Sequence, residues 1–176
     1  EEFGPLLALF QRYPLAELIV HPRVQKDMYK NTPRRAYFAR ALADSPFPVC
    51  YNGDLYTVPA LEAFQAEFPA AERIMLGRGL AGDPALARKA EGGPAAGREE
   101  LRAFHDQVYE GYAGAFGSRR NAMLRMKEVW FYLIHRFRGG ERHARQLRKA
   151  ADPRVYEAQV ASIFRDLELR EEAEPG

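Results

Sequence analysis

The stretch PVCYNGDLYTVPALEAFQAEFPAAERIMLGRGLAGDP, residues Pro48–Pro84, contains the alternation that decides the fold. A short apolar run ends in Asn-Gly-Asp, an amphipathic segment follows, and a second short apolar run ends in Gly-Arg-Gly. Short apolar runs bounded by turn residues are typical of buried strands, whereas the apolar spacing of VPALEAFQAEF is helical. The stretch therefore predicts a strand, a turn, a helix, a second strand and a second turn.

The same alternation continues toward the amino terminus. FGPLLALFQRY and PRRAYFARALAD have helical apolar spacing, and the β-branched run ELIVH between them predicts a strand. Short apolar strands separated by amphipathic helices are typical of a parallel sheet covered by helices. The first half is therefore predicted to be α/β. Beyond it, Asp83 followed by Pro84 predicts the start of another helix.

The pattern changes after Lys89. The small-residue segment AEGGPAAG, residues 90–97, is typical of a linker between domains. No strand pattern follows it, and the apolar periodicity predicts helices at about 98–115, 119–137, 141–150 and 153–167. The second half is therefore predicted to be an all-α bundle whose core contains Trp130, Phe131 and Tyr132.

The composition limits the class of protein. A chain of 176 residues with 47% hydrophobic content can bury a substantial core. Its apolar runs are far shorter than the roughly 20 residues that a membrane span needs, so we expect a protein of the cytoplasm that does not bind membranes. Cys50 is the one cysteine, which excludes an internal disulfide, and we expect it to pack in a strand and not to act as a nucleophile. The histidines lack the spacing of metal ligands, and no metal is predicted.

Positive charge is concentrated in the second half. Residues 1–97 have equal numbers of basic and acidic side chains, whereas ten basic residues and only Glu128 and Glu141 lie between Arg119 and Lys149. The basic residues are Arg119, Arg120, Arg125, Lys127, Arg136, Arg138, Arg142, Arg145, Arg148 and Lys149. Such a segment suits a polyanion such as RNA, although charged runs are often only solvated helix faces.

Polar turns follow all three predicted strands. Because ligands of parallel α/β folds lie beyond the carboxyl ends of the strands, these turns are the candidate site. They are HPRVQKDMYKN after the first strand, NGD after the second and GRG after the third. Glycines let backbone N–H groups approach an anion, and arginine offers a fork for phosphate oxygens. The turns together predict a phosphate site, although each alone is also common as a simple turn.

Three motifs carry a resemblance to a known family. LIVHPRVQKDMYKN at Leu18–Asn31, PVCYNGDLYT at Pro48–Thr57 and IMLGRGLAGDP at Ile74–Pro84 resemble the tRNA-dihydrouridine synthases in order, spacing and position at strand ends. These are flavin enzymes that reduce uridines of tRNA. The resemblance implies the last three strands of a TIM (β/α)8 barrel in residues 1–90, a linker at 91–97 and a helical tRNA-binding domain at 98–176.

The resemblance also implies site residues. FMN would be bound by His21, Asn52, Gly53, Asp54, Gly77 and Arg78. Substrate would be contacted by Arg23, Lys26, Arg119, Arg120, Arg125 and Lys127, with Arg23 facing either the cofactor or the uracil pocket. In such enzymes NADPH reduces the flavin, hydride passes to the pyrimidine, and a cysteine in the first half of the barrel donates a proton.

The chain departs from the family pattern in one respect. Only three of eight barrel strands are predicted, and the segment with the acid cysteine is absent, a role that Cys50 does not fill. We therefore expect no catalytic residue in this chain, a missing amino-terminal half of the barrel as its partner, and weak or no flavin binding and no turnover by this polypeptide alone. Two alternatives stay open: an FMN barrel acting on a free pyrimidine, and a non-catalytic RNA-binding fragment.

Overall fold

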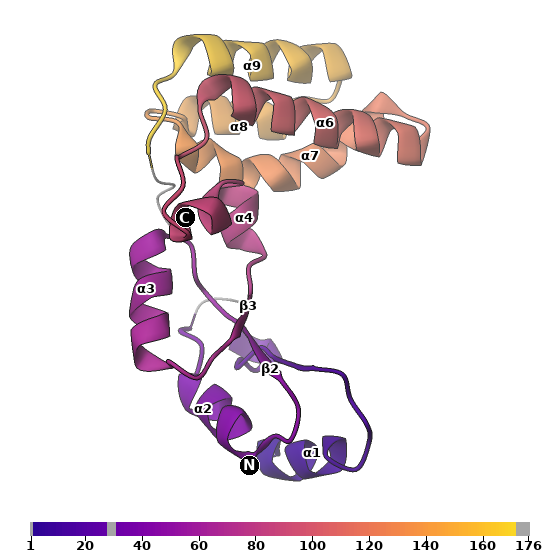
Figure 1. Ribbon diagram of the computed structural model, residues 1–176. Coiled ribbons are helices and arrows are strands. Elements are labelled where there is room, and N and C mark those ends of the chain that lie inside the picture. Colours follow the sequence, from indigo (N-terminus) through magenta and orange to yellow (C-terminus); the bar gives the residue numbers. More distant parts are fainter. Residues whose placement is uncertain (1, 28–30, 172–176) are drawn as a thin grey trace. The chain divides into compact units, whose positions relative to one another are not determined.

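The computed structural model describes residues 2–27 and 31–171, which form two compact units (Figure 1). The sheet unit is the described part of Glu1–Leu55 together with Pro59–Gly77, and the helical unit is Tyr56–Val58 together with the described part of Arg78–Gly176. Within the described ranges, no helix combines the length and the hydropathy that a membrane span requires.

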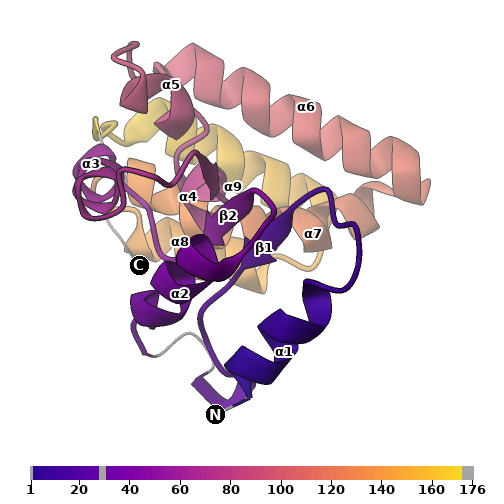
Figure 2. The same cartoon turned by 60° about the horizontal axis from the view of Figure 1, so that its bottom comes forward.

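The sheet unit contains a three-stranded parallel sheet in the order β1-β2-β3, and β1 and β2 lie side by side in Figure 2. Its register places Ile19 beside Cys50 and Cys50 beside Arg73. The predicted alternation of helices and parallel strands is confirmed. The elements are α1 (Phe3–Phe10), β1 (Leu18–Val20), the 3-10 helix η1 (Gln25–Asp27), α2 (Arg35–Asp44), β2 (Val49–Asn52), α3 (Val58–Glu67) and β3 (Arg73–Met75).

Aromatic side chains form the core of the sheet unit. Tyr51 of β2 stacks on Phe64 of α3 with ring centroids 4.2 Å apart, and Phe38 of α2 meets Tyr51 edge-on at 5.0 Å. All three side chains are fully buried. Burying a side chain of this size contributes about 1.5–3 kcal/mol, so these contacts hold α2 and α3 against β2. They thereby fix the ends of β2, where the candidate site begins.

The helical unit is built around α7, which contacts α4, α6, α8 and α9 (Figure 1). Local sequence explains the helix ends: Gly117 closes α6 with a left-handed φ of 60°, and the side chains of Ser118 and Asp152 cap α7 and α9. The elements are α4 (Arg78–Gly82), α5 (Leu86–Ala90), α6 (Arg98–Phe116), α7 (Arg119–Leu133), the 3-10 helix η2 (Ile134–Arg136), α8 (Glu141–Lys149) and α9 (Pro153–Asp166).

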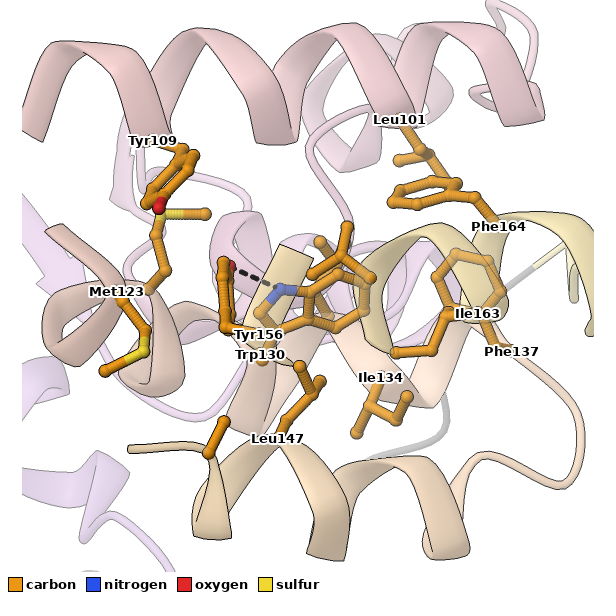
Figure 3. Packing of buried hydrophobic residues seen from close by; sticks show 14 of the residues in the cluster. Leu101, Tyr109, Met123, Trp130, Ile134, Phe137, Leu147, Tyr156, Ile163 and Phe164 are labelled. Carbon is orange, nitrogen blue, oxygen red and sulfur yellow. Dashed lines mark hydrogen bonds between the residues drawn. The ribbon is translucent and has the colours of Figure 1, made fainter. Parts of the chain in front are cut away.

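The core of the helical unit is mainly apolar and contains a chain of polar groups, of which Figure 3 shows the hydrogen bond between Trp130 and Tyr156. Trp130 Nε1 donates to the Tyr156 hydroxyl at 3.0 Å, and that hydroxyl lies 2.7 Å from His105 Nε2. His105 Nδ1 lies 2.8 Å from a carboxylate oxygen of Asp106. A proton on Nδ1 satisfies the whole chain, because Tyr156 then donates to Nε2 and the carboxylate accepts from Nδ1. Burial lowers the pKa of His105, which favours this neutral form.

The prediction that Phe131 lies in the bundle core is wrong. Trp130 is buried, whereas Phe131 is 57% exposed and Tyr132 is half-buried. Successive helical residues point about 100° apart, and the buried face of α7 follows Met123, Met126, Trp130 and Leu133 at spacings of three and four. Phe131 therefore points away from this face.

The division between the units also differs from the predicted linker at 90–97. It falls between Gly77 and Arg78, and α4 and α5 belong to the helical unit. The physical reason is packing: a Cβ at Gly82 would lie 3.6 Å from the backbone oxygen of Tyr132, so α4 lies close against α7. The predicted Gly-Arg-Gly turn is also corrected, because only Gly77 lies outside a helix and α4 begins at Arg78.

Candidate functional site

The loops after β1 and β2 meet at the carboxyl edge of the sheet. Val20 pairs with Tyr51, so the next residues, His21 and Asn52, lie opposite each other. His21 Nδ1 is 2.7 Å from the backbone oxygen of Asn52. Because a carbonyl oxygen only accepts, Nδ1 carries the proton in this hydrogen bond. The bond fixes the orientation of the exposed imidazole at the strand end.

A second contact joins the same two loops. Arg23 forms an ion pair with Asp54, and the Arg23 side chain is only 4% exposed, while Asp54 is 24% exposed. The Asp54 carboxylate therefore holds a guanidinium in place, and its own negative charge does not suit direct contact with a phosphate. His21, Arg23, Asn52 and Asp54 thus form one contact group from two neighbouring strand ends.

Packing alone explains why residue 53, between Asn52 and Asp54, is a glycine. A Cβ added at Gly53 would lie 2.6 Å from Cε1 of the buried Tyr51 ring, well inside van der Waals contact. The ring of Tyr51 thus occupies the space that any other residue would need. Glycine is required here by the sheet unit itself, whether or not a ligand binds.

The loop after β1 is organised by Asp27, which sequence reasoning missed. Its buried carboxylate accepts from the Val24 backbone N–H at 3.2 Å and from Asn31 Nδ2 at 2.9 Å, and it pairs with Arg34 at 3.2 Å. The hydrogen bond from Asn31 lowers the pKa of Asp27, although burial opposes this. The predicted substrate residue Lys26 is exposed in η1, and residues 28–30 of the motif lie outside the described residues.

A cavity of about 550 Å³ lies beside this contact group. This volume is within the range of small-molecule pockets, about 300–1,000 Å³. Apolar side chains and two guanidinium groups share its lining, a combination that suits a planar or anionic ligand. The lining residues are Glu2, Phe3, Leu6, Val20, His21, Pro22, Arg23, Val24, Arg34 and Tyr37.

Gly77 and Arg78 are described in different units. Gly77 is exposed after β3, and a Cβ added there would meet no atom of the described residues within 4 Å. Packing of the described chain therefore does not demand glycine at this position, unlike at Gly53. Arg78 starts α4 in the helical unit, where its guanidinium lies 5.4 Å from the centre of the Tyr56 ring.

Asp83 is the centre of a buried ion cluster in the helical unit. Its Oδ1 accepts from the Ala85 backbone N–H at 3.2 Å, and the helix α5 that follows starts at Leu86. Its Oδ2 pairs with Lys89 at 2.9 Å and with Arg136 at 3.1 Å, and the Asp83 and Arg136 side chains are both 1% exposed. Arg136 is therefore part of the core, and its place in the predicted basic surface is corrected.

The predicted tRNA contacts on α7 are mostly engaged within the helical unit. Arg119 pairs with Glu110 at 2.7 Å and with Glu157 at 3.0 Å, and Arg125 pairs with Glu128 at 3.2 Å. Such exposed pairs contribute about 0–1 kcal/mol, so a phosphate can replace a carboxylate in them.

Two further predicted contacts complete this set. Lys127 Nζ donates to the backbone oxygens of Arg148 and Ala150 at 3.1 Å and 2.5 Å, at the end of α8. Arg120 is exposed, and within residues 2–27 and 31–171 its side chain has no partner.

The exposed cations of α8 are different. Arg142, Arg145, Arg148 and Lys149 are all exposed, and across the described chain none of their side chains pairs with a carboxylate. Spacings of three and four place Arg142, Arg145 and Lys149 along one face of the helix. In the described part of the helical unit, a cluster of cations without a carboxylate partner therefore lies on α8. These cations belong to the predicted basic segment but not to the substrate residues that the resemblance implies.

Cys50 lies inside the sheet unit and outside the contact group. Cys50 is buried in β2, as predicted, and burial raises the pKa of its thiol, which disfavours the thiolate. Among the described side chains, no group of three or more His, Cys, Asp or Glu is arranged to hold a metal ion.

Sequence comparison relates the chain to a family of known proteins. The family model of dihydrouridine synthases matches residues 9–170. A tRNA-dihydrouridine(16) synthase of Cupriavidus necator is 36% identical over 77 residues, which are 44% of this chain and 24% of that protein. One of Pseudomonas syringae pv. tomato is 36% identical over 74 residues, 42% of this chain and 23% of that protein. The matched stretch thus spans about a quarter of the length of these relatives.

Proposed function

The chain belongs to the dihydrouridine synthase family, and from that premise we propose that it forms part of an enzyme that reduces uridine to 5,6-dihydrouridine in tRNA. The sheet unit would supply strands of a TIM (β/α)8 barrel that binds FMN, and the helical unit would bind tRNA. Parallel strands with helical connections support the first assignment. The unpaired cations of α8 support the second.

The observation that carries the proposal is the contact group at the ends of β1 and β2. His21 is fixed by the Asn52 carbonyl and Arg23 by Asp54, so both cofactor-facing side chains are oriented before any ligand arrives. The cavity beside this contact group suits a planar, phosphorylated molecule such as FMN, and the open space at Gly77 leaves the backbone there accessible to a phosphate.

Within this site the side chains would bind and orient, and none is assigned as catalytic. FMN, when bound and reduced by NADPH, supplies a hydride for the pyrimidine. His21 would hold its ring against the cofactor, Arg23 would present its guanidinium at the cavity wall, and Gly77 would admit a phosphate close to the backbone. Asp54 would act through Arg23. Cys50 is buried and takes no part as the acid.

The remaining half of the barrel is the proposed partner of the sheet unit. β1 and β3 are both edge strands, and unpaired edges invite further strands. Large apolar side chains of the unit are also exposed, a surface that a neighbouring barrel segment would cover. They are Leu6, Leu9, Tyr13, Ile19, Val24, Tyr37 and Met75.

The burial of Cys50 favours one alternative for this polypeptide by itself, namely RNA binding without catalysis. A free-pyrimidine enzyme is less well supported, because the cations of α8 would then have no use.

The test is dihydrouridine formation by the full gene product. We expect wild-type protein, incubated with NADPH and tRNA that lacks dihydrouridine, to produce the modified base, detected by mass spectrometry of digested tRNA. Arg23→Ala should lower FMN content and product together, whereas the exposed Arg12→Ala is the matched control and should change neither. Product from a free pyrimidine but not from tRNA, or no product with FMN bound, would contradict the proposal.

A further inference from the structure

A second cavity, of about 340 Å³, lies between α7 and α8 within the helical unit. None of the residues assigned above to the cofactor contributes to it. Its volume falls in the range of small-ligand pockets. The lining residues are Lys127, Trp130, Phe131, Ile134, His135, Phe137, Gly140, Glu141, Ala144, Arg145, Leu147, Arg148 and Arg170.

The inner wall of this cavity is apolar and buried. Trp130, Ile134, Phe137 and Leu147 belong to the buried core, and Figure 3 shows Trp130, Ile134 and Leu147 where α7 faces α8. Phe131 adds a large ring that is 57% exposed. An exposed aromatic ring beside an apolar wall offers a surface on which a planar group can stack.

The outer rim is strongly positive. Lys127, Arg145, Arg148 and Arg170 line the cavity together with a single carboxylate, that of Glu141. Arg145 and Arg148 are one helical turn apart, and over the described residues neither side chain has a partner. Unpaired guanidinium groups at a cavity rim suit phosphate oxygens.

The walls are held in place before a ligand binds. Lys127 Nζ of α7 donates to the backbone oxygens of Arg148 and Ala150, which fastens the end of α8. Leu147, on the opposite side of α8 from the solvent, is buried in the same core. Binding would therefore cost little reorganisation of the protein.

We propose that this cavity binds an unpaired nucleotide of RNA, with its base stacked on Phe131 and its phosphate between Arg145 and Arg148. A flat apolar surface next to two free guanidinium groups matches a base joined to a phosphate. A base-paired nucleotide has its faces covered by its neighbours, so the site selects single strands or loops. The inference rests on the proposed function only in naming tRNA as the RNA that carries the nucleotide.

Trp130 provides a specific probe because it is the one tryptophan of the chain and lines the cavity. In ¹⁵N-labelled protein, the indole N–H signal of Trp130 should shift when a short oligouridylate is added, and the shift should saturate. The same RNA annealed to its complement, and an oligoglutamate of equal length, should leave the signal in place. An equal shift with oligoglutamate, or none with oligouridylate, would overturn the proposal.

Variants locate the binding contacts. Phe131→Ala should weaken oligouridylate binding about tenfold. Phe131→Tyr should retain it, because stacking uses the aromatic face, which tyrosine keeps. Arg145→Ala with Arg148→Ala should weaken binding at least as much and flatten its salt dependence. Phe116→Ala, another exposed aromatic residue, and Arg154→Ala, an exposed arginine of α9, are the matched controls outside the cavity.

Far-ultraviolet circular dichroism of every variant separates loss of binding from loss of folding. Failure of this inference is distinguishable from failure of the proposed function. If the full gene product makes dihydrouridine while oligouridylate leaves the Trp130 indole signal unchanged, the cavity assignment alone is wrong. If the indole signal shifts while no dihydrouridine forms, only the enzymatic proposal is wrong.

Discussion

The two units satisfy their polar and apolar groups in different ways. The helical unit buries an ion cluster around Asp83 and a hydrogen-bonded chain through His105, both surrounded by an apolar core. The sheet unit has a small aromatic core, two edge strands and several exposed apolar side chains, and its polar contacts gather at the strand ends. This difference supports two proposals made above, namely that further barrel strands extend the sheet unit and that its strand ends hold a ligand.

Removing the centre of the buried ion cluster should have the largest effect. Asp83→Ala leaves Lys89 and Arg136 buried without their carboxylate, and breaking such a pair costs about 3–5 kcal/mol of unfolding free energy. Urea denaturation followed by Trp130 fluorescence measures the loss. Asp166→Ala removes the exposed pair with Arg165 and should cost about 1 kcal/mol or less. Equal denaturation midpoints for both variants would show that the Asp83 cluster does not stabilise this unit.

A glycine substitution in the sheet unit separates packing from ligand binding. Gly53→Ala should cost about 1–3 kcal/mol without any ligand, because its Cβ meets the buried ring of Tyr51. Gly77→Ala should change stability by less than about 1 kcal/mol, since its Cβ enters open space, but it should weaken FMN binding by the full gene product. Thermal denaturation and FMN titration check both. A stable Gly53→Ala variant would contradict the packing reason given for this glycine.

The pH dependence of stability should reveal the buried chain through His105. Burial lowers its pKa below the ordinary value of 6.5, so below pH 6.5 the unfolded state binds more protons than the folded state. The unfolding free energy of the helical unit should therefore fall as the pH drops from about 6.5, in the range where unfolded histidine is protonated. His105→Gln should reduce this slope between pH 7 and about 5. An unchanged slope in the variant would assign the effect to other groups.

The smallest effects on stability are expected for the exposed arginines of α7. Arg120→Ala should change the unfolding free energy by less than about 0.5 kcal/mol. It should still weaken tRNA binding and reduce the salt dependence by about one unit of slope, as expected for one lost phosphate contact. Arg125→Ala is the comparison variant, because it removes an arginine that is already paired with Glu128, whereas Arg120 is unpaired within the described residues. Filter binding over a salt series measures both, and binding that ignores salt would argue against a role for this surface.

The sequence predicted the regular elements well because their signals are local. Apolar spacing and turn residues placed the three strands and most helices, although α4 was expected to be a turn, and the motifs placed His21, Asn52 and Asp54 after neighbouring strands. What it could not predict depends on partners distant in the chain. From the sequence, Asp83 is predicted to cap a helix and Arg136 to be a surface cation. Their buried ion pair joins residues that are far apart in the chain, so local sequence patterns do not reveal it.

The exposure of Phe131 and the contacts of Asp27 also depend on residues distant in the chain or on the fold of a loop. The apolar run around Phe131 predicts a core position for it, because such a run does not show which residue faces inward, and only the position of the neighbouring helices decides this. Asp27 gave a weak signal, an acid followed by Asn31 four residues later, whose meaning depends on the fold of the loop after β1. A single sequence contains the elements but not the contacts between them.

The most direct test of the account is a double-mutant cycle on FMN binding by the full gene product, using Arg23→Ala, Asp54→Ala and the two together. Because Asp54 is proposed to act by positioning Arg23, the double variant should bind FMN no more weakly than Arg23→Ala alone. Losses of affinity that simply add, or wild-type protein that binds no FMN, would contradict the claim that these strand ends form one cofactor site.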